Sequence, residues 1–281
     1  MPILGGPGSR SAAAREAAGP DPAARSTALA ARMTGSRPGR VWALVASQAA
    51  GRGGRVSAAD VCAAAVAAVG VTGAWLSAAR GAEAGHLMRV TDEVSEQLAE
   101  LHLTLGEGPC LDAAASGGPV LASDLAGGES GRRWPVFALA ARQAGAAAIF
   151  AFPLRIGAIR SGVLGLYRER PGPLTAFQLG DALIFADTAT LLLLDAQDQA
   201  GGDLTALAGP GGQPADLAFR RAEIDQATGM LTGQLGAGIG DAFVQLRAYA
   251  YARDLRLTDV ARDIVARRLR LHPDPSRDGE A

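Results

Sequence analysis

The chain has 281 residues, of which 48% are hydrophobic and 20% are charged, and its formal net charge is −1. This length predicts about two domains, and the apolar content is sufficient for packed cores. All 27 basic residues are arginine. A Walker A loop, a protein-kinase nucleotide site and a Schiff-base enzyme each need a lysine, so these three classes are excluded. Because the total charge is close to zero, any nucleic-acid-binding surface must be local.

The cysteines and histidines predict neither a disulfide framework nor a metal site. Cys62 and Cys110 are far apart and form no CxxC motif, and the three histidines form no HExxH motif. The sequence also lacks the GxSxG motif of a nucleophilic serine. We therefore expect a cytoplasmic protein that is not an enzyme, with no catalytic residues, metal or cofactor. A Cys110 thiol of low pKa beside a buried His102 would change that expectation.

The first 40 residues are expected to form a disordered tail. They combine Arg with Ala, Gly, Pro and Ser, and they contain no apolar segment typical of a signal peptide. Residues 61–79 lack charges over about the length of a membrane span. Alanine is the commonest residue in that run, and Gly70 and Gly73 interrupt it. We therefore interpret it as a buried helix followed by a strand, and we expect no contact with a membrane.

Residues 41–200 are expected to form one mixed α+β domain. Apolar residues at helical spacing predict helices, short apolar runs predict strands, and Gly and Pro mark their ends. Thr175 is expected to be the N-cap of the longest helix. The expected helices are 41–50, 58–69, 93–101, 135–145 and 175–197, with a short one after a turn at 105–112, and the expected strands are 71–78, 86–91, 119–125, 146–156 and 161–167.

The C-terminal part is expected to be a separate helical domain at 216–271. Residues 201–215 are rich in Gly and Pro and are expected to be a linker, and residues 272–281 a tail. Thr258 is expected to be the N-cap of the last helix. A bundle this small barely buries a core of its own, so it would gain stability from a partner or from dimerisation. Its expected helices are 216–235, 240–254 and 258–269.

Three sequence runs follow one another along these C-terminal helices. They read RAEIDQATGML at 221–231, AFVQLR at 242–247 and LTDVA at 257–261, with Ile264 and Val265 after them. This segment resembles the ANTAR domain family, whose helices follow the patterns IxQAKGxLM, EAFxxLR and LxDVAxxIV. The chain departs from these patterns where Thr228 stands for the usual Lys, Thr232 for the usual Met and Asp241 for the usual Glu.

The ANTAR resemblance implies a three-helix bundle that binds an RNA hairpin and regulates transcription by antitermination. Between Arg220 and His272 lie nine arginines and six acidic residues, a local net charge of +3. Arginine suits phosphate because its planar guanidinium donates two parallel hydrogen bonds. The RNA-binding residues expected from family position and charge are Arg220, Arg221, Thr228, Arg247, Arg256 and Arg262.

Other interpretations of this part stay open. Arg267, Arg268 and Arg270 could simply solvate the last helix, whose negative end favours cations. Tyr249 and Tyr251 fit either stacking on unpaired bases or packing at a helix interface. The change to Thr at position 228 removes a phosphate contact, so the alternative function is a ligand-sensing protein-interaction module that has lost RNA binding.

Four runs in the middle of the chain resemble GAF domains, which often precede ANTAR modules. They read LGEGPCLD at 105–112, WPVF at 134–137, FAFPLRIG at 150–157 and GVLGLY at 162–167. The resemblance implies an α+β fold, with a GAF-like antiparallel sheet flanked by helices, that senses an unknown small-molecule ligand. A phospho-receiver domain, the other common partner of ANTAR modules, needs a lysine that this chain does not have.

Glu107 and Cys110 are the candidate ligand-sensing residues of the middle domain. Cys110 follows a proline at the start of an expected helix, where a thiolate is stabilised, although a small buried thiol is the alternative. Glu107, between two glycines, would line a ligand pocket or belong only to a turn. The long helix at 175–197 would pass the signal to the bundle, and its apolar run at 191–194 predicts a homodimer.

Overall fold

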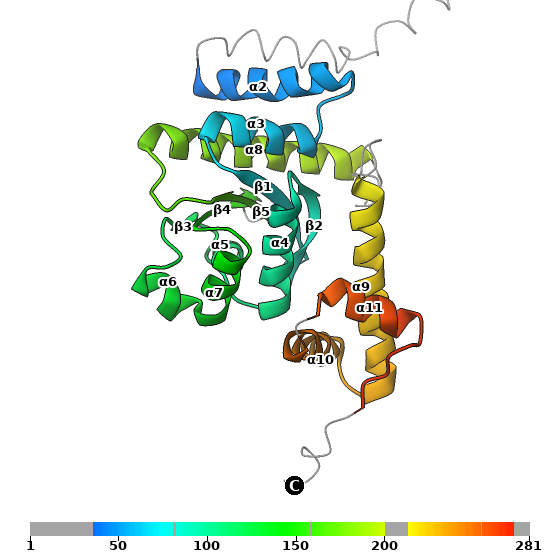
Figure 1. Ribbon diagram of the computed structural model, residues 1–281. Helices are drawn as coiled ribbons and strands as arrows, with labels where there is room; N and C mark the ends of the chain where they lie inside the picture. Colours follow the sequence, from blue (N-terminus) through cyan, green and yellow to red (C-terminus); the bar gives the residue numbers. More distant parts are fainter. Residues whose placement is uncertain (1–35, 81–82, 158, 200–212, 254, 273–281) are drawn as a thin grey trace, which may run out of the picture.

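The computed structural model describes residues 36–80, 83–157, 159–199, 213–253 and 255–272. Most of the expected N-terminal tail, the expected linker up to residue 212 and the end of the chain from residue 273 lie outside these ranges. Within them the chain forms two parts, an α+β part up to residue 199 and a bundle of three helices from residue 213 (Figure 1).

Five strands form one antiparallel sheet in the order β2-β1-β5-β4-β3. In the register of the two central strands, Trp75 of β1 lies opposite Gly165 of β5. This sheet with its flanking helices confirms the expected α+β class. The strands are β1 (Gly73–Arg80), β2 (Glu83–Val90), β3 (Val120–Ala122), β4 (Ala148–Ile156) and β5 (Ile159–Arg168).

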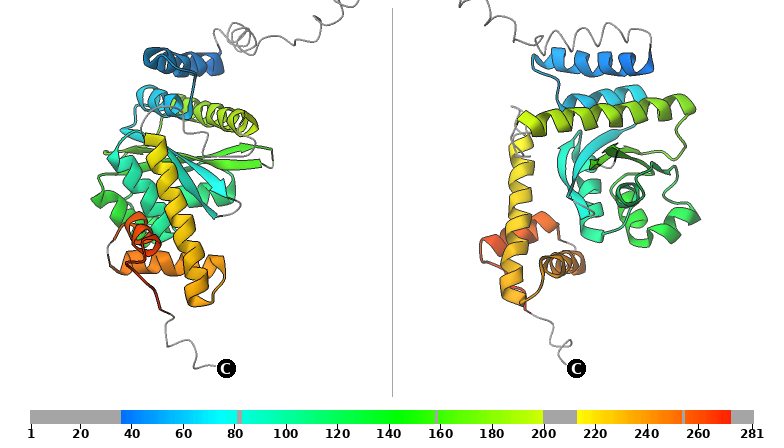
Figure 2. Two further views of the ribbon diagram at one scale, coloured as in Figure 1. Left: turned by 90° about the vertical axis from the view of Figure 1, so that its right-hand side faces the viewer. Right: turned by 180° about the vertical axis from the view of Figure 1, so that it is seen from behind.

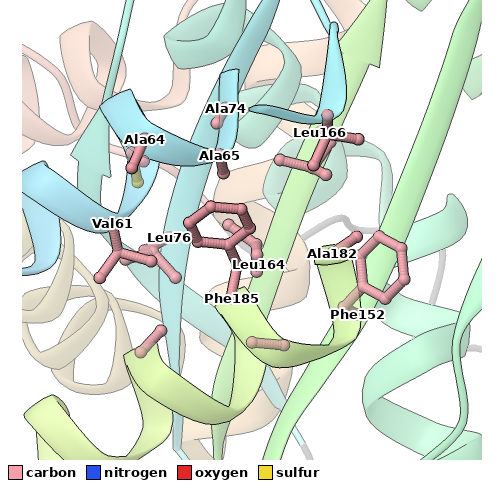
Figure 3. Packing of buried hydrophobic residues seen from close by; sticks show 14 of the residues in the cluster. Val61, Ala64, Ala65, Ala74, Leu76, Phe152, Leu164, Leu166, Ala182 and Phe185 are labelled. Atoms are coloured by element: carbon pink, nitrogen blue, oxygen red, sulfur yellow. The ribbon is translucent and has the colours of Figure 1, made fainter. Parts of the chain in front are cut away.

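One face of the sheet is covered by α3 (Ala58–Val69) and α8 (Ala176–Gln199), and α2 (Arg37–Arg52) lies over these two helices (Figure 1). Figure 3 shows Phe185 of α8 among Val61 of α3 and Leu76 and Leu164 of the sheet, all of them fully buried. The expected buried helix followed by a strand at 61–79 is confirmed as α3 and β1. Burial of these apolar side chains is the main stabilisation of this layer.

Helix α8 is long and apolar enough to cross a membrane by length and composition, and it is the one such helix among the described residues. Its side chains Ala182, Phe185, Ala189 and Leu193 are nevertheless buried in the same core as α3 and the sheet. Packing inside the α+β part therefore accounts for one side of α8, while Leu183 and Leu191 of the same helix are 40% and 61% exposed.

Four helices lie on the other side of the sheet: α4 (Glu93–Leu105), α5 (Pro109–Ser116), α6 (Gly128–Arg133), which packs on α7, and α7 (Pro135–Gln143) (Figure 1). Between them and the sheet lies a second core, in which Trp75, Leu98, Phe137 and Ile149 are each at most 1% exposed. The two faces of the sheet thus have separate apolar cores.

The C-terminal bundle consists of α9 (Gln213–Leu235), α10 (Ile239–Ala252) and α11 (Leu257–Val265). It has a third core of its own, built from Ile224, Leu231, Leu246, Leu257 and Ile264. The bundle lies beside the α+β part, with α10 packed against α4 and α9 against β2 (Figure 2).

Several helix ends differ from the sequence-based expectation. Helix α2 begins at Arg37 rather than at residue 41, because Ser36 Oγ accepts a hydrogen bond from Gly39 N and Pro38 fits the first turn. Helix α6 was not predicted, since its sequence GESGRR contains two glycines, which disfavour a helix. The expected N-cap Thr175 is confirmed, because its Oγ1 accepts from Gln178 N at 3.2 Å. Arg256, not Thr258, is the N-cap residue of α11, so that expectation was wrong.

Replacing Gly165 by Ala tests the contact between the two central strands. A Cβ at this position would lie 2.2 Å from a ring carbon of Trp75, whose side chain is buried and has no room to move. We expect Gly165→Ala to lower the free energy of unfolding by about 1–3 kcal/mol, as overpacking of a core usually does. Urea unfolding of the full chain measures this.

Gly131→Ala is the matched control, because a Cβ there meets no atom within 4 Å and Ala favours the helix α6. Equal unfolding midpoints for the two variants would contradict the packing argument.

Candidate nucleic-acid interface

Helix α4 is fixed on the sheet by hydrogen bonds at its N-terminus. Asp92, its N-cap residue, accepts with Oδ1 from the backbone N–H of Ser95 at 2.8 Å. The same oxygen accepts from the hydroxyl of Tyr167, on β5, at 3.1 Å. The start of α4 is therefore tied to a central strand. The residues that α4 buries are Ser95, Leu98 and His102.

The opposite side of α4 carries three polar residues at intervals of four, Glu96, Glu100 and Thr104. We call these three residues the α4 stripe. Residues four apart lie one above the other on a helix, so the stripe is a continuous ridge. Helix α10 packs against α4, and all three stripe residues form hydrogen bonds with arginine or threonine residues of the bundle.

Arg220 and Arg247 of the bundle bind the two ends of the stripe. Arg220, on α9, forms an ion pair with Glu96, and both side chains are partly shielded from water. Arg247, on α10, donates from Nε to the backbone carbonyl oxygen of Thr104 at 2.9 Å. Its guanidinium lies over Gly106, where a Cβ would collide with it. Burial lowers the pKa of Arg247 from its usual value, but a guanidinium stays protonated in proteins.

Glu100, in the middle of the stripe, binds the beginning of α11. Its Oε1 accepts from the backbone N–H of Thr258 at 3.4 Å and from the Thr258 hydroxyl at 3.3 Å. Its Oε2 lies 3.6 Å from Nε of Arg256. Burial raises the pKa of Glu100 above its ordinary value, and Arg256 and Thr258 act in the opposite direction. A carboxylate thus occupies the helix N-terminus, where free N–H groups and the helix dipole favour an anion.

Three of the six expected RNA-binding residues, Arg220, Arg247 and Arg256, therefore lie together along the α4 stripe. Arg262 lies within the bundle, with its Nε 3.4 Å from Glu223 Oε1, and it also donates to Asp259 at 3.0 Å. Arg221 belongs to α9, but its side chain lies outside the described part of the chain.

Thr228, one of the expected RNA-binding residues, lies inside the bundle. Its side chain is buried, and its hydroxyl donates to the carbonyl oxygen of Ile224 at 2.7 Å. Thr228 lies on the same side of α9 as Ile224 and Leu231, which are both in the bundle core. A side chain in that position does not reach a phosphate on the bundle surface.

The two tyrosines of α10 differ in their surroundings. Tyr249 is half-buried, and the guanidinium of Arg253 lies 3.8 Å from the centre of its ring. Tyr251 is 56% exposed. Packing therefore accounts for Tyr249, whereas the side chain of Tyr251 is largely exposed.

Glu107 lines a cavity of about 250 Å³ between the α+β part and the bundle. Its Oε1 also accepts from the backbone N–H groups of Val136 at 2.8 Å and Phe137 at 2.7 Å, so it caps the N-terminus of α7. Because part of the cavity wall comes from α10, a molecule bound there would touch both parts at once. The lining residues are Thr104, Leu105, Glu107, Val136, Val244, Arg247, Ala248 and Tyr251.

Cys110 is a buried thiol, 5% exposed, beside His102 in the second core. Its backbone N–H donates to Nε2 of His102 at 3.2 Å, and His102 Nδ1 donates to the carbonyl oxygen of Leu98 at 2.7 Å. Burial raises the pKa of the Cys110 thiol, and a hydrogen bond with Trp75 offsets this only in part. Burial also lowers the pKa of His102 to about 4. Both groups are therefore neutral near pH 7, unlike the thiolate and imidazolium of a reactive pair.

Glu96, Glu100 and Thr258 were not identified as functional residues from the sequence. The available signal was a pair of glutamates four residues apart on an expected helix. Such a pair is usually a solvated helix face, and nothing in its local sequence indicates which residues it meets.

The C-terminal segment has a family match. Residues 219–265 match the family model described as the ANTAR domain, so the resemblance stated for that segment is confirmed. No curated protein matches the chain.

Similar solved structures include two GAF domains of phosphoenolpyruvate-protein phosphotransferases. The domain from Coxiella burnetii is 13% identical, with a TM-score of 0.45, and the match covers 59% of this chain and 99% of that one. The domain from Acinetobacter is 12% identical, with a TM-score of 0.42, and the match covers 59% of this chain and 95% of that one. Both are distant similarities.

The buried His102 predicts that the α+β part loses stability in mild acid. The unfolded chain takes up a proton with a pKa near the ordinary value of 6.5, whereas native His102 stays neutral down to about pH 4. The free energy of unfolding therefore falls as the pH drops through that window, by up to about 1.4 kcal/mol per pH unit from this group. Protonation at Nε2 would also break the hydrogen bond from Cys110 N.

His102→Gln is the matched variant, because its side chain keeps a donor and an acceptor but does not titrate. It should be less stable than the wild type at pH 7, and the difference should shrink as the pH falls to 4.5. Urea unfolding at several pH values measures this. Parallel stability curves for the two proteins would show that His102 is not the acid-sensitive group.

Proposed function

We propose that this chain, which carries an ANTAR domain at residues 219–265, is an RNA-binding regulator of transcription controlled by a GAF-like sensor. The observation that carries the proposal is that the matched segment coincides with a folded bundle with its own core. Arg220, Arg247 and Arg256 lie together on the side of that bundle that faces α4. Guanidinium groups arranged in this way suit the phosphates of an RNA backbone.

The proposed division assigns residues 41–200 to the sensor, 201–215 to the linker and 216–271 to the effector. Helix α2 adds residues 37–40 to the sensor, and helix α9, which begins at Gln213, adds residues 213–215 to the effector. The bundle would bind an RNA hairpin near a transcription terminator in the cytoplasm. By stabilising the antiterminator hairpin, it would let RNA polymerase continue transcription past the terminator. The RNA-contacting set consists of Arg220, Arg221, Arg247, Arg256 and Arg262. Thr228 is left out because it is buried.

The sensor would respond to a small molecule whose identity the residues do not specify. Glu107 supports a site in the cavity between the two parts, because it lines that cavity together with Arg247. A ligand there would change how the bundle sits against α4. Cys110, as a buried neutral thiol, contributes packing rather than a redox response.

The alternative function is a ligand-sensing protein-interaction module that has lost RNA binding. Two observations favour it: Thr228 offers no phosphate contact, and the arginines are already occupied by the α4 stripe. Co-purification of a stable protein partner, together with indifference to RNA, would support this alternative.

The RNA-binding function is tested with Arg220→Gln, Arg221→Gln and Arg256→Gln combined in one variant. Binding of the purified chain to a pool of its own cellular transcripts is measured at low and moderate salt. The wild type should enrich short hairpins upstream of terminators and should bind them more weakly as salt rises, since phosphate contacts release counterions. The triple variant should lose most of the affinity, and its salt slope should fall by about two to three.

A matched control removes the same charge from the α+β part, by combining Arg132→Gln, Arg142→Gln and Arg170→Gln. All three residues are exposed, and none of them belongs to the bundle contacts named above. The control should bind like the wild type. If the triple variant of the bundle also keeps full affinity, the proposed RNA-contacting set is wrong.

The homodimer is a further part of the proposal, and α8 supports it. Leu183 and Leu191, eight residues apart on this helix, are 40% and 61% exposed. We expect the full chain to sediment as a dimer at tens of micromolar, and Leu183→Glu with Leu191→Glu to shift it to the monomer. Leu139→Glu, on the exposed side of α7, is the control and should stay dimeric. A wild-type protein that sediments as a monomer at this concentration would contradict the dimer proposal.

A further inference from the structure

We propose that the α4 stripe and RNA compete for the same arginines, so that the docked arrangement described above is the RNA-free form of the protein. The inference rests on the proposed RNA-binding function and adds how that function is controlled. It identifies the outer side of α4 as an interaction surface whose partner is the chain's own RNA-binding bundle.

The first argument is that the residues coincide. Arg220 and Arg256 belong to the set that family position and charge assign to RNA, and their anionic partners here are Glu96 and Glu100. Arg247, from the same set, is held by the carbonyl oxygen of Thr104. One helix thus presents two carboxylates and a carbonyl oxygen to three candidate phosphate ligands, and RNA would have to displace these groups to take over the same contacts.

The second argument is the chemistry at the beginning of α11. Glu100 receives hydrogen bonds from the backbone N–H and the hydroxyl of Thr258, and it lies beside the guanidinium of Arg256. Backbone N–H groups at a helix N-terminus, a hydroxyl and an arginine are donors that also bind phosphate oxygens. The carboxylate of Glu100 therefore makes the contacts that a phosphate would make at this point.

The third argument is that the interface is built so that it can open. The bundle keeps its own core, with Ile224, Leu231 and Leu246 buried inside it. The α+β part keeps two others, and Leu103 of α4 is partly buried against the bundle core. The ion pairs of Arg220 and Arg256 with the stripe carboxylates are charged contacts whose side chains are partly exposed. Each part can therefore stay folded when the two separate.

The test uses the full chain with Glu96→Gln and Glu100→Gln combined. Its matched control combines Glu93→Gln and Glu129→Gln, which removes two charges from exposed positions of the same part of the chain. Affinity for the pooled cellular transcripts is measured at one moderate salt concentration. Amide hydrogen exchange along α4, α10 and α11 reports docking without any RNA.

Removing the stripe carboxylates should raise the affinity for the transcripts by about tenfold, a typical size for coupling between two sites. The control should change the affinity by less than about twofold, since it alters only the general charge. Exchange at the start of α11 should speed up in the stripe variant, and the outer side of α4 should lose protection when RNA binds the wild type.

Three results would overturn the inference, and each is distinct. If the stripe variant binds the transcripts no better than the control while the wild type binds them, the stripe does not mask the arginines. If RNA binds but exchange along α4 does not change, RNA and α4 do not compete. If no form of the protein binds any transcript, the proposed RNA-binding function itself fails, and exchange still reports whether the two parts dock.

Discussion

The arrangement of the whole molecule depends on helix α4, which packs on two sides. Asp92 ties its beginning to β5 through Tyr167, and its inner residues Leu98 and His102 belong to the second core of the sheet. Glu96 and Glu100 lie on the opposite side of the helix from Leu98 and His102, and they contact the bundle. Because packed interiors are dense and transmit strain, a change around His102 would bear on the same helix that contacts the bundle. The second core and the bundle contact are therefore mechanically linked through one helix.

Much of the fold could be predicted because helices and strands carry local periodic signals. Apolar residues at helical spacing located α3, α8 and the bundle helices, and Thr175 was recognised as a cap from its own sequence position. The same helical spacing could also have predicted that Thr228 is buried. Ile224, Thr228 and Leu231 lie at intervals of four and three, which places all three on one side of α9. The family position of a lysine suggested a surface role, whereas the phase of the helix indicated the core.

The contacts between the two parts could not be predicted from the sequence, for a physical reason. Glu96 and Arg220 are 124 residues apart, and the sequence around each residue does not indicate which residue it contacts. The protonation state of the Cys110 thiol could not be predicted from its local sequence either. The proline before it and the helix after it favour a thiolate, yet the side chains of Trp75, His102 and Phe137 around this turn exclude water and reverse the effect. Both cases depend on the whole fold, which brings distant segments together in the first case and buries the thiol in the second.

The strength of the contact between the two parts suits a switch better than a permanent joint. Partly exposed ion pairs such as Glu96–Arg220 and Glu100–Arg256 contribute about 0–1 kcal/mol each, and an anion at a helix N-terminus adds about 0.3–1 kcal/mol. A total of a few kcal/mol is comparable with what a ligand supplies, since a ligand at a hundred times its dissociation constant stabilises its preferred state by about 2.7 kcal/mol. A molecule bound in the cavity beside Arg247 would shift the balance only through a difference in affinity between the docked and the separated parts, and a cavity wall shared by both parts would supply such a difference under the proposed function. An apolar interface of the same extent would hold the bundle against the α+β part more firmly, whereas under the proposed competition the charged contacts of α4 would let either RNA or a ligand release it.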